Sequence, residues 1–144
     1  MPSESPSSDE ILAKIRESGG RITATKRALV EVLARSNDHM TAEELMTAIE
    51  RSTPDVSPST VYRNLEELEE LGVVLHTHLG RGAAVYHLTG PVHGHLACSL
   101  CGSTVEVPPS MFESLARAAL RDFAFDVDRH HLAISGRCAR CQSL

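Results

Sequence analysis

The sequence predicts an α+β protein built from two small domains, and three observations lead to this fold class. Four segments with helical periodicity come first, and two extended runs joined by glycines follow them. Beyond them, short extended runs flank a single amphipathic segment. A chain of 144 residues is long enough for one domain or two small ones. Because Thr89-Gly90-Pro91 has the composition of a linker, we expect domains at 1–90 and 91–144.

Local start and stop signals bound each expected helix of the first domain. The first helix, 9–18, has Ile11, Leu12 and Ile15 on one face and ends at paired glycines. The next three helices each begin at a hydroxyl side chain that can cap them: Thr23 for 23–35, Thr41 for 41–50 and Ser57 for 57–71. Thr41 and Glu44 have the spacing of a capping box, and Pro58 suits a first helical position.

A β-hairpin is expected after the fourth helix. The runs 73–79 and 83–88 are extended, and Gly80-Arg81-Gly82 joins them. The third and fourth helices, with the short turn between them, are typical of a helix-turn-helix, and the hairpin supplies a wing. We therefore expect a winged helix-turn-helix in residues 1–90.

The second domain is expected to be a small α/β unit. Extended runs cover 92–98, 103–107 and 130–135, and an amphipathic helix covers 110–123. Ser110 and Glu113 have the spacing of another capping box at the start of that helix.

Charge and hydropathy restrict the partners of the chain. The net charge of −5 excludes a surface that is basic throughout, although 21–35 contains four basic residues against one acidic residue. Contact with nucleic acid would therefore be local. No apolar run approaches the roughly 18 residues of a membrane helix, and the polar start of the chain differs from a signal peptide. We expect a cytoplasmic protein without a membrane partner.

Four cysteines form two pairs with a spacing that suits a metal. Cys98-x-x-Cys101 and Cys138-x-x-Cys141 each offer two thiolates from one tight turn. Gly102 allows the first turn a positive φ. A tetrahedral zinc site would stabilise a domain whose apolar core is small. Unrelated reduced thiols and a redox disulfide are the alternatives.

Several of the eight histidines are also spaced for metal binding. His93 and His95 alternate along an extended run, so both rings project to one face close to the first cysteine pair. His39 precedes the third helix and His87 ends the hairpin, so these four histidines meet only where the two domains touch. For His39 or His87 alone, a hydrogen-bonded surface histidine is the alternative. His76 and His78 form a second same-face pair, and one of His130 and His131 at most can join a given site.

The motifs from about Gly19 to Cys141 together resemble the ferric uptake regulator (Fur) family of metal-dependent repressors. These motifs are RITATKR, DHMTAEEL, SPSTVYRNLEELEELGVV, VYHL, HGHLACSLCG and HHLAISGRCARC. The resemblance implies an N-terminal winged helix that binds double-stranded operator DNA and a C-terminal α/β domain that forms a homodimer. It also implies a transcriptional regulator of metal homeostasis, not an enzyme, with no small-molecule substrate.

The resemblance assigns metal ligands by position. The four cysteines match the family's structural Zn²⁺ site, and His39, His87, His93 and His95 match its inter-domain sensing site. Many iron-type members have a glutamate in place of His87, and imidazole ligands suit nickel, zinc and copper. Of a third family site only Glu113 and His130 are present, because Val92 and Gly94 replace ligands. The missing acid at Gly94 argues against a peroxide sensor of the histidine–aspartate type.

Two further segments, LGVVLHTHLGRGAAVYHL and FDVDRHHLAISGRC, are similar to the nickel-responsive branch of the family. In that branch, the positions that match His76, His78 and His131 form an additional metal site. The stretch TGPVHGH is one residue shorter and poorer in histidine than its counterpart there. We expect Ni²⁺ as the regulatory cation, with Zn²⁺ or Fe²⁺ as the alternatives.

The fourth helix is expected to place its N-terminal residues in the major groove. The expected DNA contacts are Lys26, Arg27, Ser57, Ser59, Thr60, Tyr62 and Arg63. Tyr62 would contact a thymine methyl or a phosphate, and Arg63 would contact a phosphate or guanine. The two basic residues of the second helix would contact the DNA backbone. The alternatives are partial burial of Tyr62 and an ion pair of Arg63 with Glu67.

Three other classes of protein fit the sequence less well. A zinc hydrolase or deaminase needs an open metal position and a nearby general acid or base, yet no carboxylate lies between His93 and Cys101 and the deaminase signature is absent. A thiol oxidoreductase would use the cysteines alone. A metal-storage protein would leave the helix-turn-helix without a role.

Overall fold

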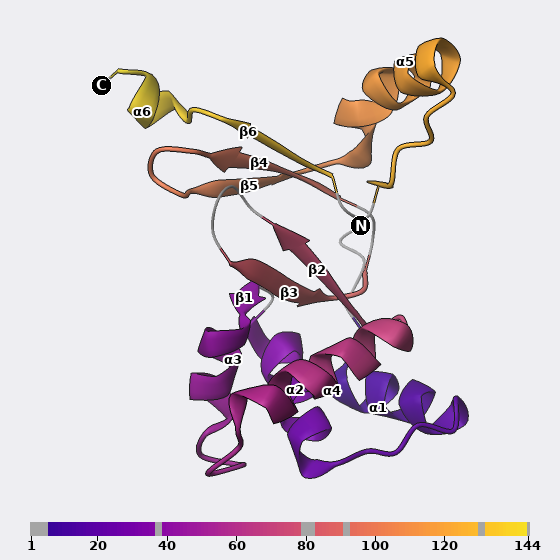
Figure 1. Ribbon diagram of the computed structural model, residues 1–144, viewed down its shortest axis with the longest axis vertical. Coiled ribbons are helices and arrows are strands. Elements are labelled where there is room, and N and C mark those ends of the chain that lie inside the picture. The colour runs from indigo at the N-terminus through magenta and orange to yellow at the C-terminus, as the bar shows by residue number, and fades with distance from the viewer. Residues whose placement is uncertain (1–5, 37–38, 79–82, 91–92, 130–131, 144) are drawn as a thin grey trace. The chain divides into compact units, whose positions relative to one another are not determined.

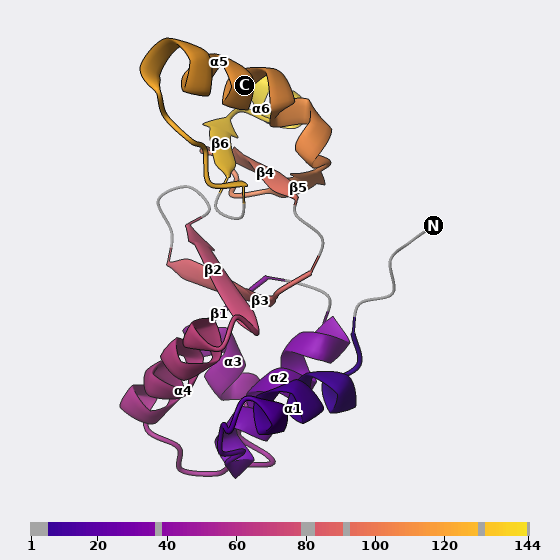
Figure 2. The ribbon, with the colours of Figure 1, turned by 90° about the vertical axis from the view of Figure 1, so that its right-hand side faces the viewer.

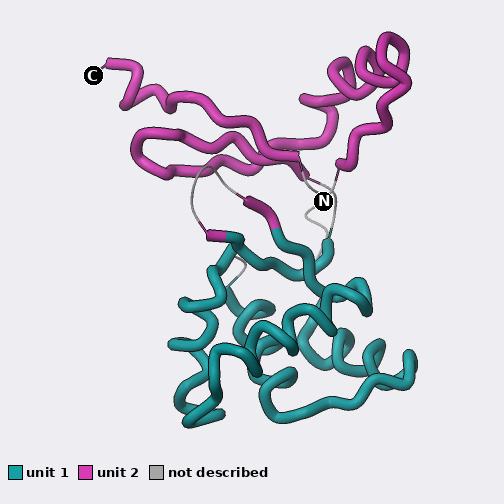
Figure 3. Tube along the Cα trace, viewed as in Figure 1, with its two compact units in different colours: residues 1–76, 84–90 teal, residues 77–83, 91–144 magenta. Residues whose placement is uncertain are grey.

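The computed structural model describes residues 6–36, 39–78, 83–90, 93–129 and 132–143. Two compact units make up the chain (Figure 3): residues 1–76 with 84–90, and residues 77–83 with 91–144. Several positions from the sequence analysis lie outside the described residues, namely the 80–82 turn, Pro91, Val92, His130 and His131. In the described part of the chain, no helix combines the length and the apolar character needed to cross a bilayer.

Helices and a small sheet form the first unit (Figure 1). The helices are α1 (Ser8–Glu17), α2 (Ala24–Ser36), α3 (Ala42–Ile49) and α4 (Pro58–Glu70). The strands are β1 (Met40–Thr41), β2 (Val74–His78), whose last two residues count with the second unit, and β3 (Ala84–Leu88), with β3 in the middle of the sheet. Both views show the sheet to one side of the helices (Figure 2).

The predicted helix starts in this unit are confirmed by hydrogen bonds. The Thr41 hydroxyl accepts from the backbone N–H of Glu44, whose carboxylate accepts from the N–H of Thr41. Ser57 caps α4, and the Thr23 hydroxyl accepts from the N–H of Lys26 at 3.2 Å. A further capping box, formed by Ser7 and Glu10 at the start of α1, was not predicted.

The apolar stripes of the four helices form one core. Leu29 of α2, Leu45 of α3, and Leu65 and Leu68 of α4 are completely buried, as is Val74 at the start of β2. The recognition-helix candidate α4 is thus fixed along its inner face, and its outer face is left for polar residues.

The second unit is built on a three-stranded sheet. Strand β4 (Gly94–Cys98) lies in the middle, antiparallel to β5 (Thr104–Val107) and parallel to β6 (Ala133–Gly136). The remaining elements are a short 3₁₀ helix η1 (Pro109–Phe112), α5 (Glu113–Phe123) and α6 (Ala139–Gln142).

The predicted capping box at the start of the second unit's long helix is wrong. Residues from Pro109 to Phe112 form the 3₁₀ helix, and α5 begins only at Glu113, without a side-chain cap. Two consecutive prolines set φ near −65° and favour a tight turn here. Ser110 therefore lies within the turn instead of capping α5.

Close packing between β4 and η1 generates a stability prediction. A Cβ added at Gly94 would lie 2.0 Å from Cε2 of the buried Phe112 ring, whereas a Cβ at Gly136 of the same sheet would meet nothing within 4 Å. Gly94→Ala should therefore lower the free energy of unfolding by about 1–3 kcal/mol. Urea denaturation followed by circular dichroism measures this loss, and Gly136→Ala is the matched control. Equal losses in the two variants would show that the ring is free to move.

Candidate functional site

The four cysteines gather at one end of the second sheet. Cys98 ends β4, Cys101 lies in the turn that follows, and Cys138 and Cys141 lie at the start of α6 and within it. Their sulfurs all lie within 4.8 Å of one another, and none forms a disulfide. Gly102 has the positive φ of +74° that its position after the first pair predicts.

Hydrogen bonds favour the thiolate forms of the first cysteine pair. A hydrogen bond between Cys101 and the Ser103 hydroxyl (3.1 Å), together with the Ser103 backbone, lowers the pKa of Cys101 to about 5. Backbone N–H groups, that of Cys101 first and that of Cys138 second, lower the pKa of Cys98. The hydrogen bond with Cys138 and burial raise the pKa of Cys141 to about 12. Four thiolates are therefore compatible only with a cation that neutralises them.

The geometry of the cluster suits tetrahedral zinc. Four sulfurs at about 2.3 Å from a central Zn²⁺ lie about 3.8 Å from one another, and the Cys101 and Cys138 sulfurs are 3.7 Å apart. A closed set of four thiolates leaves no position for a substrate or water, so the site is structural.

A second group of ligand atoms lies on the neighbouring strands of the same unit. His93 precedes β4 and His95 lies within it, with ring centroids 4.8 Å apart. His95 is opposite Glu106 of β5 in the strand register, and His93 Nε2 is 3.8 Å from Glu106 Oε1. The ligand atoms of all three lie within 4.8 Å of one another. Sequence reasoning missed Glu106, which only the pairing of β4 with β5 could have indicated.

The other two histidines of the predicted sensing set form a pair in the first unit. His39 lies just before β1 and His87 lies in β3, and their ring centroids are 4.5 Å apart. The β1–β3 pairing, with Met40 opposite Tyr86, brings them together. Each unit thus presents two imidazoles, and the second unit adds a carboxylate.

The remnant of the third family site is occupied by protein atoms. Glu113 receives the guanidinium of Arg129 at 2.9 Å and that of Arg117 at 3.5 Å. The Phe112 ring packs against Gly94. A cavity of about 10 Å³ remains there, room for one water at most. Arginine side chains therefore neutralise Glu113, and Phe112 fills the space next to Gly94.

His76 and His78 lie on β2 with one residue between them. Nδ1 of His76 contacts the carboxylate of Glu69 in α4, and the Tyr86 ring is 6.1 Å away. Burial and the charge of Glu69 raise the pKa of Tyr86. Because His131 is outside the described residues, the predicted three-histidine site stays a prediction.

The N-terminal half of α4 exposes several of the predicted DNA contacts. Tyr62 is 46% exposed and Arg63 is exposed. The Ser57 hydroxyl lies 3.1 Å from that of Ser59 and 2.9 Å from that of Thr60. The hydroxyls therefore organise the first turn, and the longer side chains extend into solvent.

Lys26 differs from the other predicted DNA contacts. Its side chain is 6% exposed, and its ammonium lies 2.6 Å from the Glu67 carboxylate of α4. The alternative partner for Arg63, Glu67, is thus engaged by Lys26, and the ammonium is bound by oxygens of the protein.

The first unit carries a polar recognition-helix candidate. The second unit carries a closed thiolate site and an imidazole–carboxylate group. Together these features are typical of metal-binding transcriptional regulators. The chain belongs to the ferric uptake regulator family, whose model matches residues 17–135.

Individual relatives support this assignment. The peroxide-responsive repressor PerR of Staphylococcus aureus is 31% identical over 134 residues, which cover 93% of this chain and 90% of that protein. The ferric uptake regulator of Helicobacter pylori, described with three functional metal-binding sites, superimposes with a TM-score of 0.78 at 23% identity and 95% coverage of both chains. That of Vibrio cholerae gives a TM-score of 0.70 at 26% identity, with 88% of this chain and 98% of that chain covered.

The protein is therefore a metal-responsive transcriptional repressor of this family, with a four-cysteine zinc site, and not an enzyme.

Cysteine and histidine variants should separate the two metal groups. Cys98→Ser should lose the bound zinc and the fold of the second unit, because metal binding contributes directly to the folding of such small units. His93→Ala should keep the zinc and the fold. Zinc content of the purified protein and far-ultraviolet circular dichroism are the measurements. A Cys98→Ser protein that keeps its zinc and its melting temperature would contradict the structural role.

Proposed function

We propose that this chain is a nickel-responsive repressor that binds operator DNA as a homodimer when a cation links its two units. The ligands would be His39 and His87 of the first unit with His93 and His95 of the second, and Glu106 would add a carboxylate. The chemistry of the donor set, four imidazoles and one carboxylate, supports this proposal most. Two of the imidazoles lie close together in the first unit, and the other two lie close together with the carboxylate in the second.

The donor set favours a borderline cation. Imidazole nitrogen suits Ni²⁺, Zn²⁺ and Cu²⁺, whereas carboxylate-rich sets suit Mn²⁺ and iron. A single carboxylate among four imidazoles lies on the nickel and zinc side of this range. Zn²⁺ and Fe²⁺ are the alternatives within the same mechanism.

Coupling between metal and DNA would follow from ligands on both units. A cation that needs ligands from each unit favours the arrangement of the units in which those ligands converge. The size of this shift is set by the difference in the cation's affinity for the two arrangements. Two recognition helices of a dimer bind half-sites about one helical turn apart, so their separation determines affinity. The Vibrio cholerae relative is described as showing a rearrangement of its DNA-binding domains.

The second unit has the surface that a homodimer needs. Among the described residues, nearly all large exposed hydrophobic side chains belong to it: Leu96, Leu100, Val105, Met111, Leu115, Leu120, Phe123, Phe125 and Ile134. Phe123 is 81% exposed. So many exposed apolar side chains in one small unit favour a protein partner, and a second copy of the chain is the partner that the family implies.

DNA recognition is assigned to α4 and the segment before it. Tyr62 and Arg63 would contact base edges or phosphates, and Ser59 and Thr60 lie nearby in the first turn of α4. Arg27 of α2 would contact the DNA backbone. The β2–β3 hairpin would serve as the wing. His76 and His78, with His131, would form an additional metal site that adds nickel selectivity.

Metal-dependent DNA binding tests the main proposal. Operator fragments are selected from random-sequence duplexes with nickel-loaded protein, and fluorescence anisotropy then measures affinity with Ni²⁺, Zn²⁺, Fe²⁺ or chelator. We expect Ni²⁺ to strengthen binding by at least tenfold over chelator, and His93→Ala to abolish that gain while leaving the zinc of the four cysteines in place. Equal affinity with and without metal would refute the proposal.

The same assay distinguishes the named alternatives. A larger effect of Zn²⁺ or Fe²⁺ than of Ni²⁺ would replace the cation and keep the mechanism. Release of iron-loaded protein from DNA by hydrogen peroxide, as the name of the Staphylococcus aureus relative suggests for that protein, would place the chain with the peroxide-responsive members.

Arg63→Ala should weaken binding to the selected fragment by about ten- to a hundredfold, because a good contact to a base is worth about 1–3 kcal/mol. The exposed residue Arg51, in the turn after α3, provides a control with the same loss of charge. Equal weakening by Arg63→Ala and Arg51→Ala would show a general charge effect instead of recognition by α4.

A further inference from the structure

We infer that Lys26 is a positioning residue for DNA recognition: its buried ammonium joins the segment before α2 to the recognition helix and fixes Arg21 relative to α4. The inference rests on the proposed function, in which α4 binds the major groove. It gives Lys26 a role different from the phosphate contact that its charge predicts.

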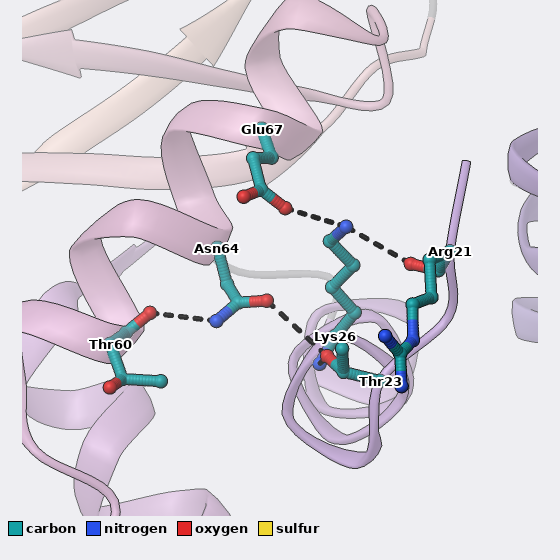
Figure 4. A network of polar contacts seen from close by, with 6 residues as sticks. All are labelled: Arg21, Thr23, Lys26, Thr60, Asn64 and Glu67. Atoms are coloured by element: carbon teal, nitrogen blue, oxygen red, sulfur yellow. Dashed lines mark hydrogen bonds and ion pairs between the residues drawn. The ribbon is translucent and has the colours of Figure 1, made fainter.

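Lys26 bridges two elements that are distant in sequence (Figure 4). Its Nζ lies 2.6 Å from Oε2 of Glu67 in α4 and donates to the backbone carbonyl of Arg21 at 3.0 Å. The lysine side chain is buried, whereas that of Glu67 is partly open to solvent at 44%. One ammonium group therefore holds a point in the α1–α2 connection against the second half of the recognition helix.

A second polar contact joins the same two elements closer to the start of α4. The Thr23 hydroxyl lies 3.4 Å from Oδ1 of Asn64, and the Asn64 amide donates to the backbone carbonyl of Thr60 at 2.7 Å. Asn64 is buried at a position in α4 whose neighbours Val61, Leu65 and Leu68 are apolar core residues. Thr23 and Lys26 together thus contact two successive turns of α4.

Buried polar contacts of this kind specify orientation. An unpaired buried ammonium is strongly unfavourable, so Lys26 is accommodated only where both oxygens are in place. Hydrogen bonds also require donors and acceptors at fixed distances and angles. The network therefore selects one placement of the 21–23 segment along α4.

Arg21 is the group whose position depends on this network. Its side chain is exposed, while its own carbonyl accepts the Lys26 hydrogen bond. The Arg21 guanidinium, held at a fixed distance from Tyr62 and Arg63, can contact a phosphate only when α4 lies in the major groove of the DNA. Specific binding would then depend on Lys26, although Lys26 itself touches no DNA.

The test compares Lys26→Met with Lys14→Met in the full-length, metal-loaded protein. Lys14 is the only other lysine in the chain and is exposed on α1, so the two variants lose the same charge. Affinity is measured for the fragment selected by the wild-type protein and for a random-sequence duplex, at a series of salt concentrations.

We expect Lys26→Met to weaken binding to the selected fragment about tenfold, to change random-sequence binding less than twofold and to leave the salt slope for the random-sequence duplex unchanged. Lys14→Met should change neither affinity. A fall of about 0.9 in the slope of log affinity against log salt, on both duplexes, would show that Lys26 contacts a phosphate directly and would overturn the inference.

Variants of Glu67 keep the test informative if Lys26→Met folds poorly. Glu67→Gln preserves an acceptor for the ammonium and should bind the selected fragment nearly as well as wild type. Lys26→Met/Glu67→Leu should regain thermal stability, because the two apolar side chains can pack against each other, yet should remain about tenfold weaker on the selected fragment. Full affinity of this double variant would overturn the inference.

The outcomes separate this inference from the proposed function. If wild-type protein selects no DNA sequence, the proposed function fails and the inference fails with it. If wild-type protein binds its fragment with metal and Lys26→Met binds equally well, only the role of Lys26 is refuted.

Discussion

The fold of the second unit depends on the cross-link that a metal makes between its two cysteine pairs. Among its described residues, Val107 and Phe112 are the only large hydrocarbon side chains that are buried, which is too little apolar surface to hold a sheet and two helices. The first unit has a core to which all four helices contribute. Zinc binding at the four cysteines therefore replaces a hydrophobic core, and it ties α6 to the turn between β4 and β5.

The four-cysteine site and the histidine–carboxylate group differ in how completely their own ligands can surround a cation. Four thiolates from one unit fill a tetrahedral coordination sphere and leave no position for a water ligand. His93, His95 and the exposed Glu106 offer only part of a coordination sphere, so a cation bound there needs ligands from elsewhere. Imidazole nitrogens also bind a cation more weakly than thiolates do and release it more readily. In the proposed function, stability and metal response thus depend on different chemistry within one small unit.

Sequence reasoning succeeded where the signal is local. The apolar stripes, the Thr41 capping box and the cysteine spacing all depend on residues within a few positions of one another, and the structure confirms them. It failed where the partner is distant. Glu106 joins the histidines only through the pairing of β4 with β5, and Lys26 is buried only because Glu67 lies opposite it. The sequence of a basic segment does not indicate whether a given charged side chain faces solvent or the protein interior.

The guanidinium of Arg129 at Glu113 has a consequence for how the protein responds to its surroundings. A cation held by a carboxylate dissociates when its concentration falls, whereas an arginine is part of the chain and stays charged at every physiological pH. The charge of Glu113, next to Phe112, is therefore balanced without a bound cation. A change in metal supply therefore leaves the charge balance at Glu113 unaltered.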